Sequence, residues 1–345
     1  MIFRELSNGQ AKFFIDTVQL YDAYKDAFVK NKSCKGGMHW KKSKNREYLF
    51  RTRDRYGNGK SLGPRSERTE KIFARFKKNK EKVSRHFSSL KSRLKEQARF
   101  CKAAKIQRVP RVVTNLLRLL DQRKVLGNSF MVIGTNALFA YEAAAGVFLD
   151  QDILATSDMD ILWDPRPKLV LVSDNEPGRA DFMDIIRKAD KSFEIMDKNS
   201  FRAVNKDGYM IDLLKPVPSM AFMQEKKQVG GKYDLEAVEI MNLEWLLSSP
   251  KFVQTVIGDD GFPATMVVPD PRAFSLHKLW LGSQEGRDPL KRRRDTQQGV
   301  TTARLVLRYL PQYMFKSSAL RMFPAAIVES ARQAIDDMQI PPDFE

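Results

Sequence analysis

Two aspartates, Asp158 and Asp160, stand two residues apart inside the apolar stretch SDMDILW at residues 157–163. In an extended strand, residues two apart project to the same side, so both carboxylates are expected to share one face. Like charges on a face that favours burial are costly unless a cation lies between them. Mg²⁺ is the simplest such cation, because it prefers carboxylate oxygens and keeps substrate phosphates in its shell. A solvated strand end is the alternative explanation of the pair taken alone.

A glycine and a threonine, Gly134 and Thr135, follow the short apolar run at residues 131–133 and precede an apolar segment of helical character. At a strand-to-helix turn, free backbone N–H groups and the helix dipole favour a phosphate. Glycine permits close backbone approach, and the threonine hydroxyl can donate a hydrogen bond to a phosphate oxygen. The turn is therefore a candidate phosphate site.

A third carboxylate, Asp212, lies in a second apolar stretch, GYMIDLL at residues 208–214. An acidic residue on a neighbouring strand is what a two-metal site for phosphoryl transfer needs, and Asp212 is expected to act as general base or as ligand of the second metal. The alternative is an aspartate at a solvent-facing strand position.

The elements expected to position these residues follow from hydrophobic periodicity and turn signals. Residues 131–149 approach the length of a membrane span, but Gly134, Asn136 and Glu142 interrupt them, which favours a buried strand followed by a buried helix. Helices are predicted at residues 10–29, 66–104, 112–123, 179–191, 272–282, 289–310 and 317–338. Strands are predicted at residues 38–42, 47–54, 168–173, 193–196, 201–204, 209–214, 238–241 and 252–257.

The positive charge is concentrated in one third of the chain. The net charge is +18, and residues 30–111 carry 28 Lys and Arg against 6 Asp and Glu. Such a block is typical of a polyanion partner, most often nucleic acid. Trp40, Tyr48, Phe50 and Tyr56 stand among these cations and offer stacking platforms for unpaired bases, which favours RNA over DNA. A solvated charged helix with its aromatic residues in a small core is the alternative, and both can hold together. The cations expected to contact nucleic acid are Lys41, Lys42, Arg51, Arg53, Lys77 and Lys78.

The order of the three parts resembles the DNA polymerase β-like nucleotidyltransferase superfamily: a Gly-Thr turn opening a helix, then Ser-Asp-x-Asp, then an aspartate in a later strand. The chain is similar to minimal bacterial nucleotidyltransferases of the abortive-infection toxin type. By this resemblance, nucleotide contacts fall to Gly134, Thr135 and Ser157. The same resemblance implies that Asp158, Asp160 and Asp212 bind metal and carry catalysis.

A weaker part of the resemblance lies near the C-terminus, where related enzymes carry an inward lysine and then a Lys/Arg–Asp cluster. Lys278 lies on an otherwise apolar helix and is a candidate phosphate cation, with a surface lysine as the alternative. Arg292 is a candidate nucleotide contact, and Lys291 and Asp295 could orient nucleotide or acceptor. A solvated basic turn is the alternative for residues 292–294, and His277 is expected to pack rather than to catalyse.

Two cysteines and three histidines, without metal-ligand spacing, argue against a disulfide framework or a histidine-centred site and suit a reducing cytoplasm. The N-terminus has no signal-peptide pattern, and no membrane partner is expected.

The sequence therefore predicts an α+β protein with a polymerase β-like nucleotidyltransferase core of mixed sheet and helices. The expected domains are a basic N-terminal domain at 1–110, the core at 111–270 and a helical subdomain at 271–345. The expected reaction is transfer of a nucleoside monophosphate from an NTP such as ATP to a hydroxyl of RNA, with tRNA as the first choice. The expected cofactor is Mg²⁺ or Mn²⁺. By the resemblance, the protein could also act as a toxin. The alternatives are transfer to a protein or small molecule, and a nucleic-acid-binding or regulatory protein whose nucleotidyltransferase-like domain is not catalytic.

Overall fold

The computed structural model divides the chain into two compact units, one formed by Met1–Ala11 and Gln107–Glu345 and the other by Lys12–Ile106. The structure describes residues 3–34, 36–43, 45–53, 56–166, 181–197, 200–218, 227–231 and 234–336. The predicted mixture of helices and mixed sheets is confirmed, whereas the three predicted domains and the two boundaries between them stay predictions.

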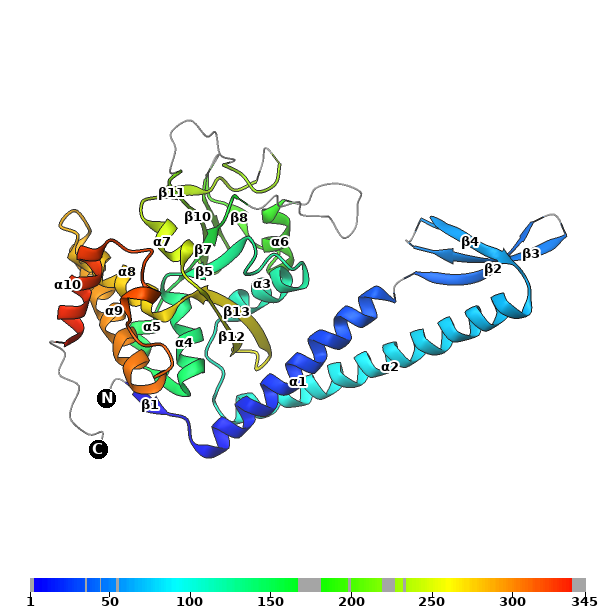
Figure 1. Cartoon of the computed structure of the whole chain (residues 1–345), viewed down its shortest axis with the longest axis horizontal. Helices are drawn as coiled ribbons and strands as arrows, with labels where there is room; N and C mark the ends of the chain where they lie inside the picture. Colours follow the sequence, from blue (N-terminus) through cyan, green and yellow to red (C-terminus); the bar gives the residue numbers. More distant parts are fainter. Residues whose placement is uncertain are drawn as a thin grey trace. The chain divides into compact units, whose positions relative to one another are not determined.

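Two helices form the body of the Lys12–Ile106 unit: α1 (Asn8–Ser33), which belongs to it from Lys12 onward, and α2 (Glu67–Ala103). They lie side by side (Figure 1), and the rings of Phe13 and Phe100 stack 5.8 Å apart. The predicted start of the second helix is confirmed, because the Ser66 hydroxyl caps it in a reciprocal pair with Thr69.

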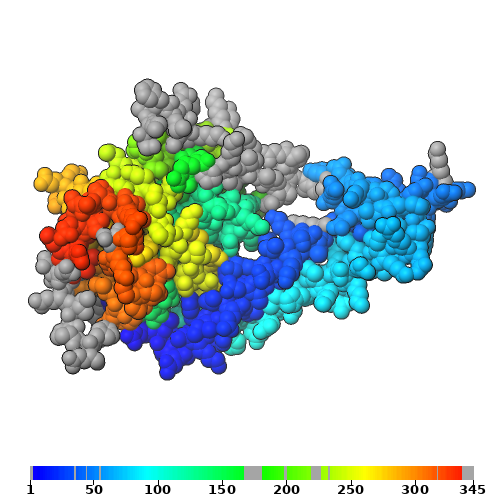
Figure 2. Space-filling model, in the orientation of Figure 1, coloured from blue at the N-terminus to red at the C-terminus, as the bar shows by residue number. Residues whose placement is uncertain are grey.

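A three-stranded antiparallel sheet of β2 (Gly37–Ser43), β3 (Arg46–Thr52) and β4 (Gly59–Pro64) completes this unit. In the space-filling view the sheet and the first turns of α2 form one continuous lobe (Figure 2). The first two strands match the predicted pair. The third was not predicted as a strand, because GKSLGP lacks the β-branched and aromatic residues that mark strands.

The larger unit is built around a mixed six-stranded sheet in the order β5-β7-β10-β9-β8, with β11 also pairing with β10. Strands β7 and β10 run parallel, whereas β5 and β9 are antiparallel to their neighbours. The strands span β5 (Phe130–Ile133), β7 (Asp158–Trp163), β8 (Glu194–Ile195), β9 (Arg202–Val204), β10 (Met210–Pro216) and β11 (Val238–Ile240).

Two further antiparallel pairs flank this sheet: β1 (Phe3–Glu5) with β6 (Val147–Leu149), and β12 (Lys251–Ile257) with β13 (Pro263–Pro269). Every residue of β13 is buried. This strand was not predicted, because a proline at each end and the absence of polar alternation conceal a buried strand.

The helices of the larger unit cover both faces of the sheet. Phe130 and Val132 of β5 pack in one apolar cluster, whereas Met131 and Ile133 pack in a second cluster that includes residues of α7 and α8. None of the helices described combines the length and apolar character needed to cross a membrane. The helices span α3 (Arg111–Gln122), α4 (Leu138–Ala145), α5 (Gln151–Leu154), α6 (Phe182–Ala189), α7 (Leu243–Ser248), α8 (Pro271–Ser283), α9 (Pro289–Tyr309) and α10 (Ala325–Asp336), with 3₁₀ turns at η1 (Thr135–Ala137) and η2 (Ser317–Ala319).

Two helix predictions need correction, and one strand prediction is not addressed. The single helix predicted for residues 317–338 is wrong: η2 and α10 are separate, because Pro324 cannot lie inside a helix and instead precedes α10. The helix predicted at 179–191 is confirmed in type but begins later among the described residues, at Phe182. The predicted strand at 168–173 lies outside the described residues.

Candidate active site

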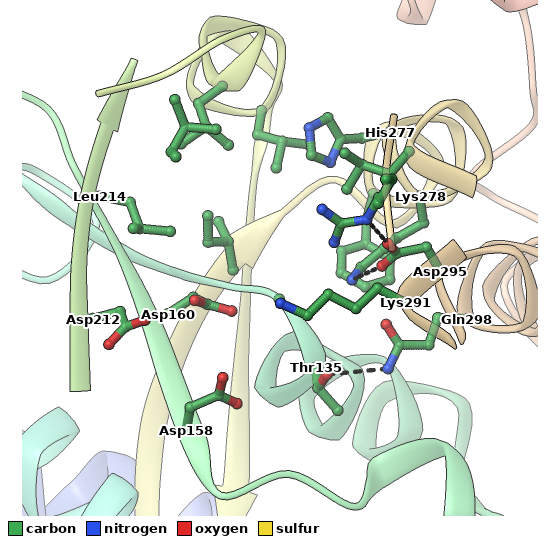
Figure 3. Close-up of a pocket in the computed structure, with 18 of the residues that line it drawn as sticks. Thr135, Asp158, Asp160, Asp212, Leu214, His277, Lys278, Lys291, Asp295 and Gln298 are labelled. Carbon is green, nitrogen blue, oxygen red and sulfur yellow. Dashed lines mark hydrogen bonds and ion pairs between the residues drawn. The ribbon is translucent and has the colours of Figure 1, made fainter. Parts of the chain in front are cut away.

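Three carboxylates lie on one face at the start of two adjacent parallel strands. Asp160 of β7 is the register partner of Asp212 of β10, and Asp158 lies two residues before Asp160. Figure 3 shows all three directed toward one cavity. Burial, and then the neighbouring Asp158 carboxylate, raises the pKa of Asp160 to about 7, with Asp212 adding to the effect. The group therefore resists carrying its full negative charge without a nearby cation.

Gly134 is required by the packing of the turn after β5. Its φ is +64°, and a Cβ at this position would lie 2.0 Å from Oδ2 of Asp160. The sequence suggested that glycine lets the backbone approach a phosphate. The structure adds a second reason, because the space beside Gly134 is taken by the Asp160 carboxylate, and the phosphate contact stays a prediction.

The Thr135 hydroxyl is fixed by two donors from α9. Arg294 Nη2 donates to Oγ1 over 3.2 Å and Gln298 Nε2 donates over 3.1 Å. A hydroxyl oxygen has two lone pairs, so both acceptor positions are used and the O–H remains as a donor. Thr135 lines the same cavity as the carboxylates. Its geometry therefore suits an acceptor-rich ligand such as a phosphate.

Asp212 is paired on both of its oxygens by Arg202. Nε of Arg202 lies 2.7 Å from Oδ1 and Nη2 lies 2.6 Å from Oδ2, and Asp212 is 5% exposed. Arg202 was not predicted as a site residue. The signal was present, however, because pairing the predicted strands at 201–204 and 209–214 across their tight turn sets Arg202 opposite Asp212.

The opposite wall of the cavity carries cations from α8 and α9 and from the loop between them. Lys278 Nζ lies 2.7 Å from Asp295 Oδ1, and Arg287 Nε lies 2.5 Å from Asp295 Oδ2. Lys278 is 8% exposed, so it is buried and ion-paired rather than a surface lysine. The Lys291 side chain extends toward the carboxylates (Figure 3).

Two predicted nucleotide contacts do not line this cavity. Nε of Arg292 points to the carbonyl of Gly282, 3.4 Å away, and Ser157 is exposed, with its carbonyl accepting from the backbone N–H of Met210. Helical spacing explains the first difference, because Lys291, Arg294, Asp295 and Gln298 follow i, i+3, i+4 and i+7 on one face of α9. The same spacing was available in the sequence.

The cavity has a volume of about 540 Å³, within the range of ligand pockets, which is about 300–1,000 Å³. Beyond the charged groups and the polar Thr135, His277 and Gln298, the lining is mainly apolar, with contributions from β10, β11, α7 and α8 among others. The apolar side chains include Leu214, Val238, Ile240, Leu243, Leu246 and Leu281. One end of the cavity is therefore suited to charged groups and the other to an apolar or aromatic moiety.

His277 lies in an aromatic cluster at the cavity wall. Its ring is 5.8 Å from that of Trp280 and 6.4 Å from that of Trp245. Burial, reinforced by Lys278, lowers the pKa of His277 to about 3, so the imidazole is neutral near pH 7. A buried, neutral imidazole is consistent with the expectation that His277 packs rather than catalyses.

The carboxylates fit a divalent cation only in part. Asp158 and Asp160 offer oxygen ligands on one face, and burial raises the pKa of Asp160 although Lys278 and Arg202 act in the opposite direction. The oxygens of the third carboxylate, Asp212, are paired with Arg202. Accordingly, no group of three or more His, Cys, Asp or Glu side chains in the described ranges is arranged to hold a metal ion.

The six cations predicted to contact nucleic acid are all exposed. Lys41 and Lys42 lie on β2, Arg51 and Arg53 lie at and just after the end of β3, and Lys77 and Lys78 lie on α2.

The aromatic residues between those cations are divided between packing and exposure. Trp40 packs against Phe73 with ring centroids 5.8 Å apart, whereas Tyr56 is 62% exposed. The aromatic residues therefore form a small core only in part, and their contact with nucleic acid stays a prediction.

Comparison with known families agrees with the site. A family model described as nucleotidyltransferase matches residues 111–323, a span that holds β5, β7, β10 and the cation-bearing α8 and α9. The chain belongs to this nucleotidyltransferase family, which confirms the prediction at the level of the family and supports a transferase. The searches of curated proteins and of solved structures gave no match.

Proposed function

We propose that this chain is a divalent-metal-dependent enzyme that transfers a nucleoside monophosphate from an NTP to a hydroxyl of RNA, such as tRNA. One observation carries the proposal: Asp158, Asp160 and Asp212 face Thr135, Lys278, Lys291 and Arg294 around a single cavity. Carboxylates on one wall suit a cation, and a hydroxyl donor with cations on the other suits phosphates.

The proposed reaction forms a bond between the acceptor oxygen and the α-phosphorus of the NTP. The bond from that phosphorus to the bridging oxygen breaks, and pyrophosphate leaves. Mg²⁺ or Mn²⁺, held by Asp158 and Asp160, would neutralise charge on the phosphates. Asp212 would serve as general base or as ligand of a second cation.

On the phosphate side, the Thr135 O–H would donate to a phosphate oxygen, with Gln298 and Arg294 holding the hydroxyl in the donor orientation. Lys291 and Lys278 would supply positive charge toward the leaving pyrophosphate, as Lys does in other phosphoryl-transfer sites. The apolar end of the cavity would accept the rest of the nucleotide.

Transfer is tested by incubating the full chain with each α-labelled NTP, Mg²⁺ and total RNA. The expected result is label in RNA with wild type and at least about a 100-fold loss with Asp158→Ala, because several kcal/mol of charge stabilisation depend on the metal site. Asp207→Asn, an exposed aspartate in the β9–β10 turn, is the matched control and should retain activity. Label in protein or in a small molecule would reassign the acceptor, and equal behaviour of wild type and Asp158→Ala would refute catalysis.

The Arg202–Asp212 pair favours a second candidate, a nucleotide-binding regulatory domain without transfer. A guanidinium that occupies both Asp212 oxygens neutralises one carboxylate without a metal. Under this alternative, NTP would raise the melting temperature while no acceptor is labelled. Under the first candidate function, Arg202→Gln leaves Asp212 unpaired and should tighten Mg²⁺ binding in titrations without nucleotide. Arg166→Gln, which removes the arginine partner of Asp164 outside the cavity, should not.

A further inference from the structure

The Lys12–Ile106 unit contains a small hollow lined by cations. Its volume is about 330 Å³, and its described lining is formed by Ser33, Arg51, Thr52, Arg53 and Lys60. The hollow lies where α1 ends and where β3 meets β4. None of the described residues that line it is acidic.

The strand register brings the cations together. Arg51 on β3 is the partner of Lys60 on β4. Pairing continues past the end of β3, because the backbone N–H of Arg53 donates to the carbonyl of Asn58 over 2.7 Å. Arg51 and Arg53 are two residues apart along an extended segment, so they project to the same side. The sheet thus fixes three cations around one point.

These cations differ from Arg202, Lys278 and Arg287 of the nucleotidyltransferase site, each of which has a carboxylate partner. Among the described residues, no ion pair involves Arg51, Arg53 or Lys60, and all three are exposed. The Arg51 guanidinium lies 5.3 Å from the ring centre of Phe76, a cation–π contact that orients it. Like charges held on neighbouring strands disfavour each other, so an anion between them would be stabilising.

The hydroxyls at the hollow are engaged within the unit. Thr52 lies between Arg51 and Arg53, so its side chain projects to the opposite side of the strand, where Oγ1 accepts from the backbone N–H of Gly37 over 2.8 Å. The Ser33 hydroxyl donates to the carbonyl of Lys30 over 2.7 Å. Two guanidinium groups and one ammonium therefore remain to match the acceptor oxygens of a phosphate, which arginine can bind in a bidentate manner.

We infer that this hollow binds a backbone phosphate of the RNA acceptor, an inference that rests on the proposed function for the identity of the strand. Tyr56, 62% exposed, lies in the turn between Arg53 and Asn58 and offers a ring on which an adjacent base can stack. The exposed cations on β2 and α2 extend the positive surface of the same unit. Lys60 joins the predicted nucleic-acid contacts.

The experiment measures binding of a labelled single-stranded RNA to the full chain by fluorescence anisotropy over a series of salt concentrations. The double variant Arg53→Ala/Lys60→Ala is compared with Lys91→Ala/Lys95→Ala, which removes the same charge from exposed positions of α2. The expected result is at least about a tenfold loss of affinity for the first variant only. For the first variant, the slope of log binding constant against log salt concentration should become less negative by about 0.7. This is the change for one lost phosphate contact on a single strand.

Equal losses of affinity and slope in the two variants would overturn the inference in favour of diffuse attraction, as would no loss in either. A DNA strand of the same sequence tests the source: tighter binding of DNA, with the same sensitivity to Arg53→Ala/Lys60→Ala, would overturn the assignment to RNA. Displacement of RNA by polyglutamate as readily as by an unlabelled strand would overturn phosphate recognition.

Failure of the proposed enzymatic function can be distinguished from failure of the phosphate site, because label transfer and RNA affinity are measured separately. Asp160→Asn should abolish label transfer and leave RNA affinity unchanged, because it lies in the other unit. If wild type transfers no label and Arg53→Ala/Lys60→Ala still loses RNA affinity, the phosphate site stands and the enzymatic proposal alone fails.

Discussion

The cations of the two candidate sites, one in each unit, differ in whether a carboxylate pairs with them. In the nucleotidyltransferase unit, Lys278 and Arg287 share Asp295, and Arg202 is paired with Asp212. In the Lys12–Ile106 unit, Arg51, Arg53 and Lys60 surround a hollow without a described acidic partner. Buried paired charges hold fixed positions, as recognition of one small ligand demands, whereas exposed unpaired charges suit a long polyanion that supplies many phosphates.

The largest expected effect on stability comes from breaking a buried pair. Asp295→Ala leaves Lys278 buried without its carboxylate, so the free energy of unfolding in urea should fall by about 3–5 kcal/mol. The double variant Asp295→Leu/Lys278→Met should recover most of this loss because it removes both charges. A cost below about 1 kcal/mol for Asp295→Ala would contradict the description of Lys278 as a buried charge that depends on its partner.

Gly134→Ala should damage the site more than the fold. The new Cβ would displace the Asp160 carboxylate, and a shift of about 1 Å at a reacting group can cost about 100-fold in kcat/KM. Gly146→Ala is the matched control, because Gly146 has a similar φ of +65° but no atom within 4 Å of the added Cβ. Gly134→Ala should also lose more stability, because the ψ of −156° at Gly134 lies in a region that is essentially restricted to glycine, whereas Gly146 has a ψ of +33°. Compared per folded molecule, only Gly134→Ala should lose activity. Equal activity in the two would show that the Asp160 position is unimportant.

A smaller effect is expected from Gln298, which acts through Thr135. Gln298→Met removes one of the two donors that fix the hydroxyl, and kcat/KM should fall by up to about tenfold, the upper range for a hydrogen bond between neutral groups. In a Thr135→Val background the same change should add almost nothing, which a general structural effect would not produce. Gln297→Met, at the exposed neighbouring position, should match wild type.

The smallest effect on stability is expected in the basic unit. Lys77→Ala/Lys78→Ala removes two exposed cations of α2, and the free energy of unfolding should change by less than about 0.5 kcal/mol. RNA affinity should nevertheless decrease, measurably at low salt. A loss of stability comparable to that of Asp295→Ala would remove the contrast between the two units.

Much of the site could be predicted because its chemistry depends on short-range patterns. Asp158 and Asp160 stand out as charges in an apolar strand, and Asp212 stands out in the same way. The alignment of Asp160 with Asp212 was open, because a parallel pairing register is set by tertiary packing rather than by neighbouring residues. Arg202 and the α9 face were within reach, since hairpin pairing and helical spacing locate them.

The parts that escaped prediction share a physical cause. Strand β13 is buried along its whole length, so it lacks the alternation that marks a half-exposed strand. The break before α10 was missed because apolar spacing continued across Pro324, although proline disfavours a continuous helix. The packing of Gly134 against Asp160 was not predicted, because contact between a turn and a neighbouring strand cannot be seen in sequence order.

The central claim is that Asp158 and Asp160 hold a metal ion that binds an NTP. The most direct test measures the melting temperature of the full chain with NTP, in the presence and in the absence of Mg²⁺. With Mg²⁺ and NTP at about 100 times its Kd, the nucleotidyltransferase unit should gain about 2.7 kcal/mol, or about 5–10 °C. The shift should require Mg²⁺, disappear in Asp160→Asn and persist in the control Asp207→Asn. A shift of the same size in Asp160→Asn, or one independent of Mg²⁺, would contradict the assignment of Asp158 and Asp160 as the metal-holding pair.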